Sequence, residues 1–223
     1  MKNPYLTRPD AFYALAKMSK FHSDLMEVMD SNGFDMLDNL GRRNILMSAA
    51  QEKYFAEALS RRFKVTCNGK TGEPDIMIHT LDRELECKLT SRQKSGAISF
   101  QTDYETLCKK GSLDYLYVVA SRSFDEFAVV LYENLTKEDF RPPASGSRGK
   151  TQLMKYKAAD RAKILVGNFE SVNDRELQKL KTRLANMSLS RSARQKTLKS
   201  INYWQSTPTK YTINLESITN AKC

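Results

Sequence analysis

The chain has 223 residues, of which 40% are hydrophobic and 28% charged, enough for one substantial core and unlike a disordered chain. No apolar run approaches the roughly 20 residues that a membrane-spanning helix needs, and the first residues lack the apolar core of a secretory signal. Four cysteines without CxxC spacing, and two histidines, argue against a zinc site or a disulfide framework. We therefore expect a cytoplasmic protein in a reducing compartment.

The net charge of +10 is unevenly distributed along the chain. Residues 141–223 contain 17 Lys and Arg against 5 Asp and Glu, whereas residues 1–140 contain 19 and 21. Between Leu177 and Leu215 there are eight basic residues and no acidic one. A surface of one sign is typical of proteins that bind polyanions. Nucleic acid is the favoured partner, ahead of an acidic membrane surface or an acidic protein.

Two helices are predicted at the start of the chain. Apolar residues recur at helical spacing from Pro9 to Asp30, where Ser31-Asn32-Gly33 ends the run. A second helix is expected from about Arg42 to Phe63, with a pair of arginines near its end that suits the helix dipole. A short strand over 64–67 should follow.

The segment from Glu73 to Thr90 predicts two strands joined by a tight turn. Residues 76–78 form an apolar run, and residues 84–89 alternate strictly in polarity. Leu85, Cys87 and Leu89 should therefore face a core, while Glu86 and Lys88 share the opposite face. Asp75 stands at the start of the neighbouring strand, where a hairpin would bring it close to Glu86.

Two carboxylates and an ammonium gathered at strand ends suit the hydrolysis of phosphodiesters. Hard oxygen ligands such as Asp75 and Glu86 favour Mg²⁺, which keeps several waters and completes its shell with substrate phosphate. Such a metal polarises a phosphoryl oxygen and lowers the pKa of a bound water. Lys88 would stand near that water and stabilise the developing negative charge.

The order Pro74-Asp75, ten residues, then Glu86-x-Lys88 resembles the signature of the PD-(D/E)XK nuclease superfamily, whose best-known members are type II restriction endonucleases. The resemblance implies Asp75, Glu86 and the backbone carbonyl of Cys87 as ligands of Mg²⁺, for which Mn²⁺ would substitute. It also implies a further acid on the preceding helix. Glu52 fits that place, with Glu57 as its rival, although either could be a solvated helix charge.

The elements after the hairpin extend the resemblance to about residue 132. A basic loop over 91–96 should be followed by a helix from about Ser99 to Lys110 and by two apolar strands, Leu113 to Ala120 and Phe127 to Tyr132. The expected class is α/β, a mixed sheet flanked by helices. This is also the core order of the restriction-endonuclease-like fold.

The last third of the chain differs in character. Residues 141–151 form a basic loop rich in Pro, Gly and Ser, and Ala144 to Thr151 match a relaxed phosphate-binding loop. Because prolines and polar residues separate it from the preceding strand, we expect no nucleotide cofactor. A strand is expected within 162–169, and a final edge strand over 209–215.

A helix capped by Asn173 is expected, with Leu177, Leu180, Leu184 and Met187 on one face. A second, basic helix should run from 191 towards 204. Two helices joined by a short turn could form a helix-turn-helix reader of DNA, or an ordinary helical pair with a solvated basic face.

The sequence thus predicts a catalytic core over 1–140 and a basic DNA-binding region over 141–223, and leaves open whether these form one domain. The expected function is a Mg²⁺-dependent endonuclease acting on double-stranded DNA, of the type II restriction kind and homodimeric. A structure-specific nuclease and a non-catalytic DNA-binding regulator are the alternatives. The expected catalytic residues are Asp75, Glu86, Lys88 and Glu52, and the expected DNA-binding residues are Arg92, Lys94, Gln101, Arg148, Lys150, Arg191, Arg194 and Lys196.

Overall fold

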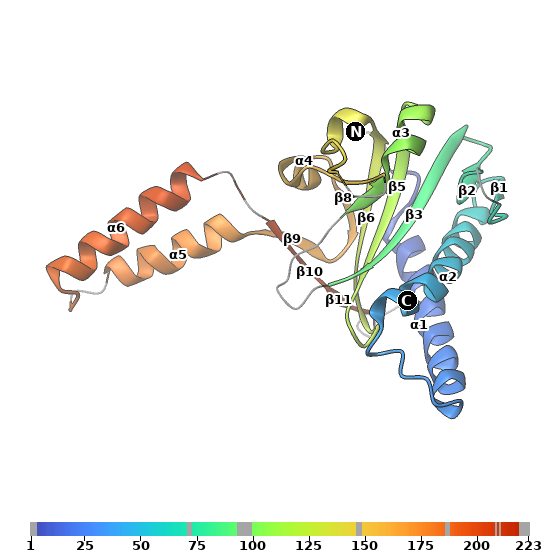
Figure 1. Ribbon diagram of the computed structural model, residues 1–223, viewed down its shortest axis with the longest axis horizontal. Helices are drawn as coiled ribbons and strands as arrows, with labels where there is room; N and C mark the ends of the chain where they lie inside the picture. Colours follow the sequence, from blue (N-terminus) through green and yellow to red (C-terminus); the bar gives the residue numbers. More distant parts are fainter. Residues whose placement is uncertain are drawn as a thin grey trace.

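A mixed β-sheet forms the centre of the computed structural model, which describes residues 4–70, 73–92, 100–145, 149–185, 188–207, 209 and 211–218 (Figure 1). Within these residues the sheet has seven strands, and β3 and β5 are its one parallel pair. In spatial order the strands are β1 (Val65–Thr66), β2 (Ile76–Ile78), β3 (Arg83–Ser91), β5 (Leu113–Ala120), β6 (Glu126–Leu135) and β11 (Glu216–Ser217), with β8 (Lys163–Val166) also pairing with β6.

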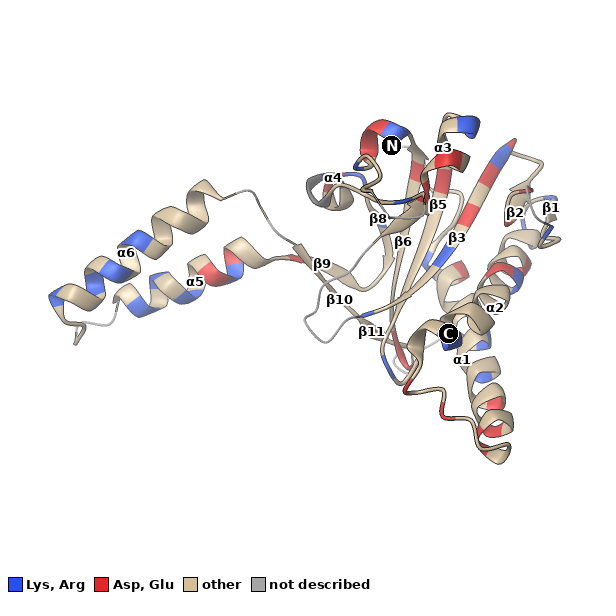
Figure 2. Ribbon diagram, viewed as in Figure 1, with Lys and Arg blue, Asp and Glu red and all other residues tan. Residues whose placement is uncertain are grey.

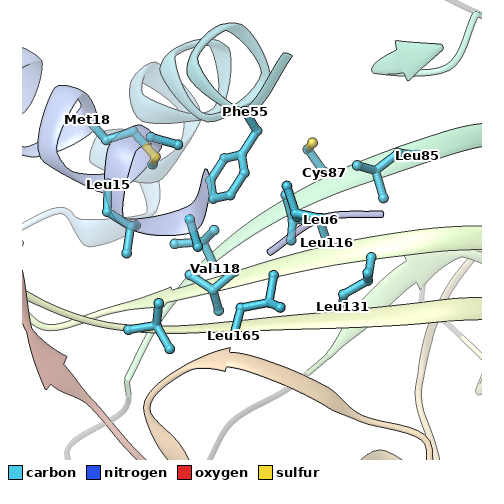
Figure 3. Packing of buried hydrophobic residues seen from close by; sticks show 14 of the residues in the cluster. Leu6, Leu15, Met18, Phe55, Leu85, Cys87, Leu116, Val118, Leu131 and Leu165 are labelled. Carbon is cyan, nitrogen blue, oxygen red and sulfur yellow. The ribbon is translucent and has the colours of Figure 1, made fainter. Parts of the chain in front are cut away.

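Strand β5 explains why the sheet needs cover on both faces, because all eight of its residues are buried. Leu116 and Val118 point into one core with Leu85 and Cys87 of β3 (Figure 3). Tyr115 and its alternate neighbours point into a second core on the opposite face. Near-continuous apolar sequence is expected of a strand covered on both sides.

Helices α1 (Arg8–Ser31) and α2 (Leu40–Ser60) cover the first face. Thr7 caps α1 by accepting from the Asp10 amide, and Asp10 bonds back to the Thr7 amide. Buried Arg43 fixes α2 to the ends of β3 and β5 by donating to the Ser91 hydroxyl at 2.9 Å and to main-chain carbonyls at Ser121 and Arg122. The position of α2 on the sheet is therefore set by buried polar contacts as well as by packing.

The second face is covered by smaller elements. A two-stranded ribbon of β4 (Gln101–Asp103) and β7 (Lys150–Gln152) lies against it, with α3 (Tyr104–Lys110), α4 (Lys155–Asp160) and the 3-10 turn Lys137–Asp139 nearby. Phe100 and Leu107 pack into the second core.

A second ribbon, β9 (Asn168–Ser171) and β10 (Tyr211–Asn214), leads into two helices, α5 (Val172–Ala185) and α6 (Arg191–Ser206). These helices lie side by side and project from the body along the longest axis of the molecule (Figure 1). Among the described residues, no helix is both long and apolar enough to cross a membrane.

The predicted class, an α/β chain with a mixed sheet flanked by helices and a basic, mostly helical C-terminal region, is confirmed. Both N-terminal helices, the hairpin and the two apolar strands lie where the sequence indicates. The prediction of a helix from Ser99 is wrong over its first part, because residues 101–103 form β4 and the helix begins at Tyr104. Asp103 caps that helix by accepting from the Thr106 amide.

Two predictions about the C-terminal region are also corrected. The strand expected within 162–169 is two strands separated by Gly167, which has φ 78°. A Cβ there would lie 2.5 Å from the Asn214 carbonyl oxygen, so the turn requires glycine. Asn173 does not cap α5, because the Ser171 hydroxyl accepts from the Asp174 amide in its place. Of the face predicted on that helix, Met187 lies outside the described residues.

His22 is a buried histidine on α1. Its ring stacks on Phe124 with the centroids 4.5 Å apart. Burial, reinforced by the nearby charge of Arg43, lowers the pKa of His22 to about 4. The unfolded chain therefore binds a proton near the ordinary histidine pKa of about 6.5, whereas the folded chain resists it until about pH 4.

We expect the free energy of unfolding to fall as the pH drops from 6.5 to 4, because the unfolded state binds more protons in that window. In a His22→Phe variant, urea unfolding at a series of pH values should show this loss reduced. His79, the other histidine, is exposed, and His79→Gln should keep the wild-type dependence. An unchanged pH dependence in His22→Phe would contradict the assignment.

Candidate active site

The register of the hairpin brings Asp75 and Glu86 together. Ile76 of β2 pairs with Leu85 of β3 in antiparallel fashion, so the next residues outward, Asp75 and Glu86, stand opposite one another. Residues directly opposite in an antiparallel pair share one face of the sheet. One oxygen of Asp75, Oδ2, accepts from the Cys87 amide at 2.7 Å, which fixes its carboxylate against β3.

Lys88 lies on the same face, two residues beyond Glu86. Its Nζ is 3.0 Å from Oε2 of Glu86 and 3.8 Å from Oδ2 of Asp75. Burial opposes the charged form of Lys88, but the attraction of Glu86 and Asp75 outweighs it and raises the pKa of the ammonium. Lys88 is therefore a cation at neutral pH and acts as a hydrogen-bond donor, not as a base.

Glu52, and not Glu57, faces this group from α2. Buried Gln51 anchors the helix beside it by donating to the Leu116 carbonyl at 3.1 Å. The pKa of Glu52 is raised first by burial and then by the negative charge of Asp75, with Glu86 adding to it and Lys88 opposing it. Glu57 turns towards α1, where it accepts from the Tyr13 hydroxyl at 2.7 Å.

A cavity of about 280 Å³ opens at this point. Glu52, Asp75 and Glu86 line it, together with Thr106 and Lys110 of α3 and with Gly69, Lys70, Glu73 and Pro74 before β2. Sequence reasoning did not single out Thr106 and Lys110, because nothing local specifies how that helix packs. In a neighbouring cavity of about 290 Å³, two of the three acids are already paired, Glu84 with Lys110 and Asp114 with Arg83, both at 2.8 Å.

The donor set fits a hard divalent cation. Asp75 and Glu86 offer carboxylate oxygens on one face, and the Cys87 carbonyl points to the same strand edge as its amide, which faces Asp75. No three acidic, cysteine or histidine side chains of the described residues converge to hold a metal by themselves. Mg²⁺ needs one or two protein carboxylates plus water and phosphate, so two acids and a carbonyl are compatible with it. The Cys87 thiol is buried in the first core, which raises its pKa (Figure 3).

Two tyrosines place the β4–β7 ribbon beside these residues. In the parallel β3–β5 pair, Glu86 is in register with Tyr115 and Lys88 with Tyr117. The Tyr115 hydroxyl accepts from Thr102 at 2.9 Å, and the Tyr117 hydroxyl donates to the Gln101 carbonyl at 2.9 Å. Strand β4 thus crosses the sheet next to the row formed by Glu86 and Lys88.

Two predicted DNA-binding residues meet on this ribbon. Gln101 of β4 and Lys150 of β7 are exposed and line a groove of about 430 Å³ with Arg141, which sequence reasoning did not single out. Arg141 forms no ion pair with an acid of the described residues, whereas Lys150 lies opposite Asp103, with which it interacts electrostatically. The groove therefore joins two cations and an amide beside the carboxylates.

Of the other predicted DNA-binding residues, the four that the structure describes do not line the cavity. Exposed Arg92 follows β3, and its amide donates to the Ala120 carbonyl. Arg191, Arg194 and Lys196 are exposed on α6, in the projecting helical pair. Lys94 and Arg148 lie outside the described residues.

Comparisons with known proteins do not extend this description. No protein-family model matches the chain, and a search of curated proteins gives no significant match. The function has to be argued from the geometry of the site and the charges around it.

The short contacts of Lys88 lead to a prediction about metal affinity without DNA. Because its ammonium stands within 3.8 Å of both acids, it repels a cation bound there. Lys88→Met should therefore bind Mn²⁺ about tenfold more tightly in calorimetry, whereas Asp75→Asn and Glu86→Gln should bind it more weakly. Lys137→Met removes an exposed lysine elsewhere and should leave the affinity unchanged. Equal affinity of Lys88→Met and wild type for Mn²⁺ would show that the Lys88 ammonium does not lie close to the bound metal.

Proposed function

We propose that this chain is a magnesium-dependent endonuclease that hydrolyses phosphodiester bonds in double-stranded DNA. The observation that carries the proposal is the convergence of Asp75, Glu86 and Lys88 on one face of β3. The ammonium nitrogen of Lys88 lies 3.0 Å from Oε2 of Glu86 and 3.8 Å from Oδ2 of Asp75. Glu52 lines the same cavity as the two acids. Hydrolysis at phosphorus needs cation-binding acids, a donor near the attacking water and a place for its proton, and this group supplies all three.

A bound Mg²⁺ would polarise the phosphoryl oxygen and lower the pKa of a coordinated water. Asp75 and Glu86 would hold it, with the Cys87 carbonyl at the same strand edge. Lys88 would donate to the attacking water and to the phosphate oxygen on which negative charge develops. Glu52, whose pKa is raised above that of an ordinary glutamate, would accept the proton that the water loses as its oxygen bonds to phosphorus. The leaving oxygen would take a proton from solvent as its bond to phosphorus breaks.

Double-stranded DNA as substrate is supported by the charges around the cavity. Arg141 and Lys150 line the groove on the β4–β7 ribbon, where they would contact phosphates that flank the scissile one. The excess of basic residues after residue 140 agrees with a polyanionic partner. Sequence specificity of the type II restriction kind, and the homodimer that a palindromic site would require, stay predictions.

Digestion of a long, sequence-diverse DNA with Mg²⁺ tests the proposal directly. Discrete fragments would support a sequence-specific endonuclease, and a smear or cleavage of branched DNA alone would indicate a structure-specific one. DNA binding without cutting would leave a regulator and contradict the proposal. Chelation of the metal should stop all cleavage.

Variants of the three converging residues should separate chemistry from folding. Asp75→Asn and Glu86→Gln should each lower cleavage by at least about 100-fold, because each removes a negatively charged ligand while keeping its shape. Lys88→Ala should lower it by about 10²–10³-fold. Glu57→Gln is the matched control on α2, since Glu57 faces α1. Wild-type cleavage by either acid variant, with its fold intact by circular dichroism, would overturn the assignment.

Glu52 should set the acidic limb of the pH–rate profile. Its raised pKa means that the carboxylate is lost by protonation at a higher pH than for an ordinary glutamate, so cleavage should fall as the pH drops through that value. Glu52→Gln should cleave slowly and lack this limb. Retention of the same limb in Glu52→Gln would assign it to another group.

A further inference from the structure

The projecting helical pair is an insertion between two paired strands. Strands β9 and β10 form an antiparallel ribbon in which Ser171 is opposite Tyr211. Residues 172–207, which we call the arm, leave at the end of β9 and return to the start of β10 (Figure 1). Neither core of the body has a member among the described residues of the arm. The arm is therefore carried by the body without being part of its packing.

The arm is joined firmly to the body at its base. Buried Asn173, at the start of α5, donates from its amide nitrogen to the carbonyls of Trp204 and Thr207 at 3.2 and 3.0 Å, which ties the two ends of the arm together. Phe169 of β9 contacts Phe100, which immediately precedes β4, with the ring centroids 6.4 Å apart. The base of the arm thus stands on the face of the sheet that carries Glu86, Lys88 and the β4–β7 ribbon.

Beyond its base, the arm carries charge of one sign. From Leu177 to Thr207 it has seven Lys and Arg and no acidic residue, and Figure 2 shows basic residues along both helices with acids near the start of α5 alone. In the part that the structure describes, Lys179 is the one of these seven with a carboxylate partner, Glu176. The seven are Lys179, Lys181, Arg183, Arg191, Arg194, Lys196 and Lys199.

The partner of such a surface should be a polyanion. A second arm is excluded by like charge. A membrane would need a broad apolar face opposite the charges, whereas the exposed large apolar side chains among the described residues of the arm are Leu198 and Tyr203. A helix-turn-helix reader needs helices that cross at about 90–120°, whereas α5 and α6 lie side by side (Figure 1). The phosphate groups along a DNA duplex are complementary in charge to the basic side chains along the two helices of the arm.

We propose that the arm is a clamp for the phosphate backbone of double-stranded DNA, which grips the duplex away from the cut and independently of sequence. The part of this proposal that refers to the cut rests on the proposed nuclease function, whereas the contact of the arm with DNA does not. Strand β8 lies three strand spacings from β3, about 14 Å, and α6, with 16 residues, is about 24 Å long. The clamp should therefore reach about one helical turn from the scissile bond.

The test is a binding experiment with the full-length chain in which Arg191, Arg194 and Lys196 are all changed to Gln. Affinity for two unrelated 30-base-pair duplexes is measured by fluorescence anisotropy across salt concentrations, without metal. Each lost phosphate contact should reduce the magnitude of the slope of log affinity against log salt by about 0.9, up to about 2.7 for three contacts. Both duplexes should lose affinity by the same factor. The control changes Lys20, Arg122 and Lys137, exposed cations of the body, and should keep the wild-type slope.

Two further measurements complete the test. In a second variant a two-residue Asn-Gly turn replaces residues 172–210, which the β9–β10 register accommodates, and its fold is checked by urea unfolding. On a long duplex this variant should lose at least as much affinity and salt dependence as the triple variant, because it lacks every cation of the arm. On duplexes that end within about half a turn of the cut, wild type and both variants should bind equally.

An unchanged slope in both arm variants, or an equal drop in the control, would overturn the clamp. So would loss of affinity for one sequence alone, which would make the arm a base reader. Loss of binding to vesicles of anionic lipid, with DNA binding intact, would assign the arm to a membrane surface. If wild type cuts no DNA but the arm variants still lose slope, the nuclease proposal fails and the clamp stands.

Discussion

The hydrogen bond from the Cys87 amide to Asp75 links the candidate site to the core of the protein. Cys87 places its side chain among Leu85, Leu116 and the residues of α1 and α2, so packing fixes the position of its backbone. The same backbone then holds an acid that belongs to the neighbouring strand. Because of this bond, the separation of Asp75 and Glu86 depends on the register of the hairpin and on the burial of one small side chain.

The site also depends on charges that are difficult to hold together. Glu52, Asp75 and Glu86 face one cavity, and burial and mutual repulsion raise the pKa of Glu52. Lys88 compensates part of this negative charge through its contacts with Glu86 and Asp75. The remaining excess is a reason for a site to attract a cation. Clusters of this kind cost stability in the free protein and are typical of positions selected for chemistry.

The sequence was sufficient for the parts of the fold that local pattern determines. Alternation in residues 84–89 correctly predicted that Leu85 and Cys87 are buried, and Leu89 packs against the same core while partly exposed. The predicted hairpin also placed Asp75 opposite Glu86. Local pattern failed at β4, because the extended form of Gln101 depends on Tyr117 and on a partner strand about fifty residues later. Arg141 was missed for the same reason, since only that pairing makes it part of a groove.

The insertion of the arm between β9 and β10 has a consequence for how the chain can vary. The entropic cost of closing a loop rises slowly with its length, by about 0.6 kcal/mol for each doubling. Helices of different length could therefore be placed between Ser171 and Tyr211 at little cost to the sheet. The reach of the protein along a bound polymer and the arrangement of its acids are thus encoded by separate stretches of sequence, and mutation can change one while the other is conserved.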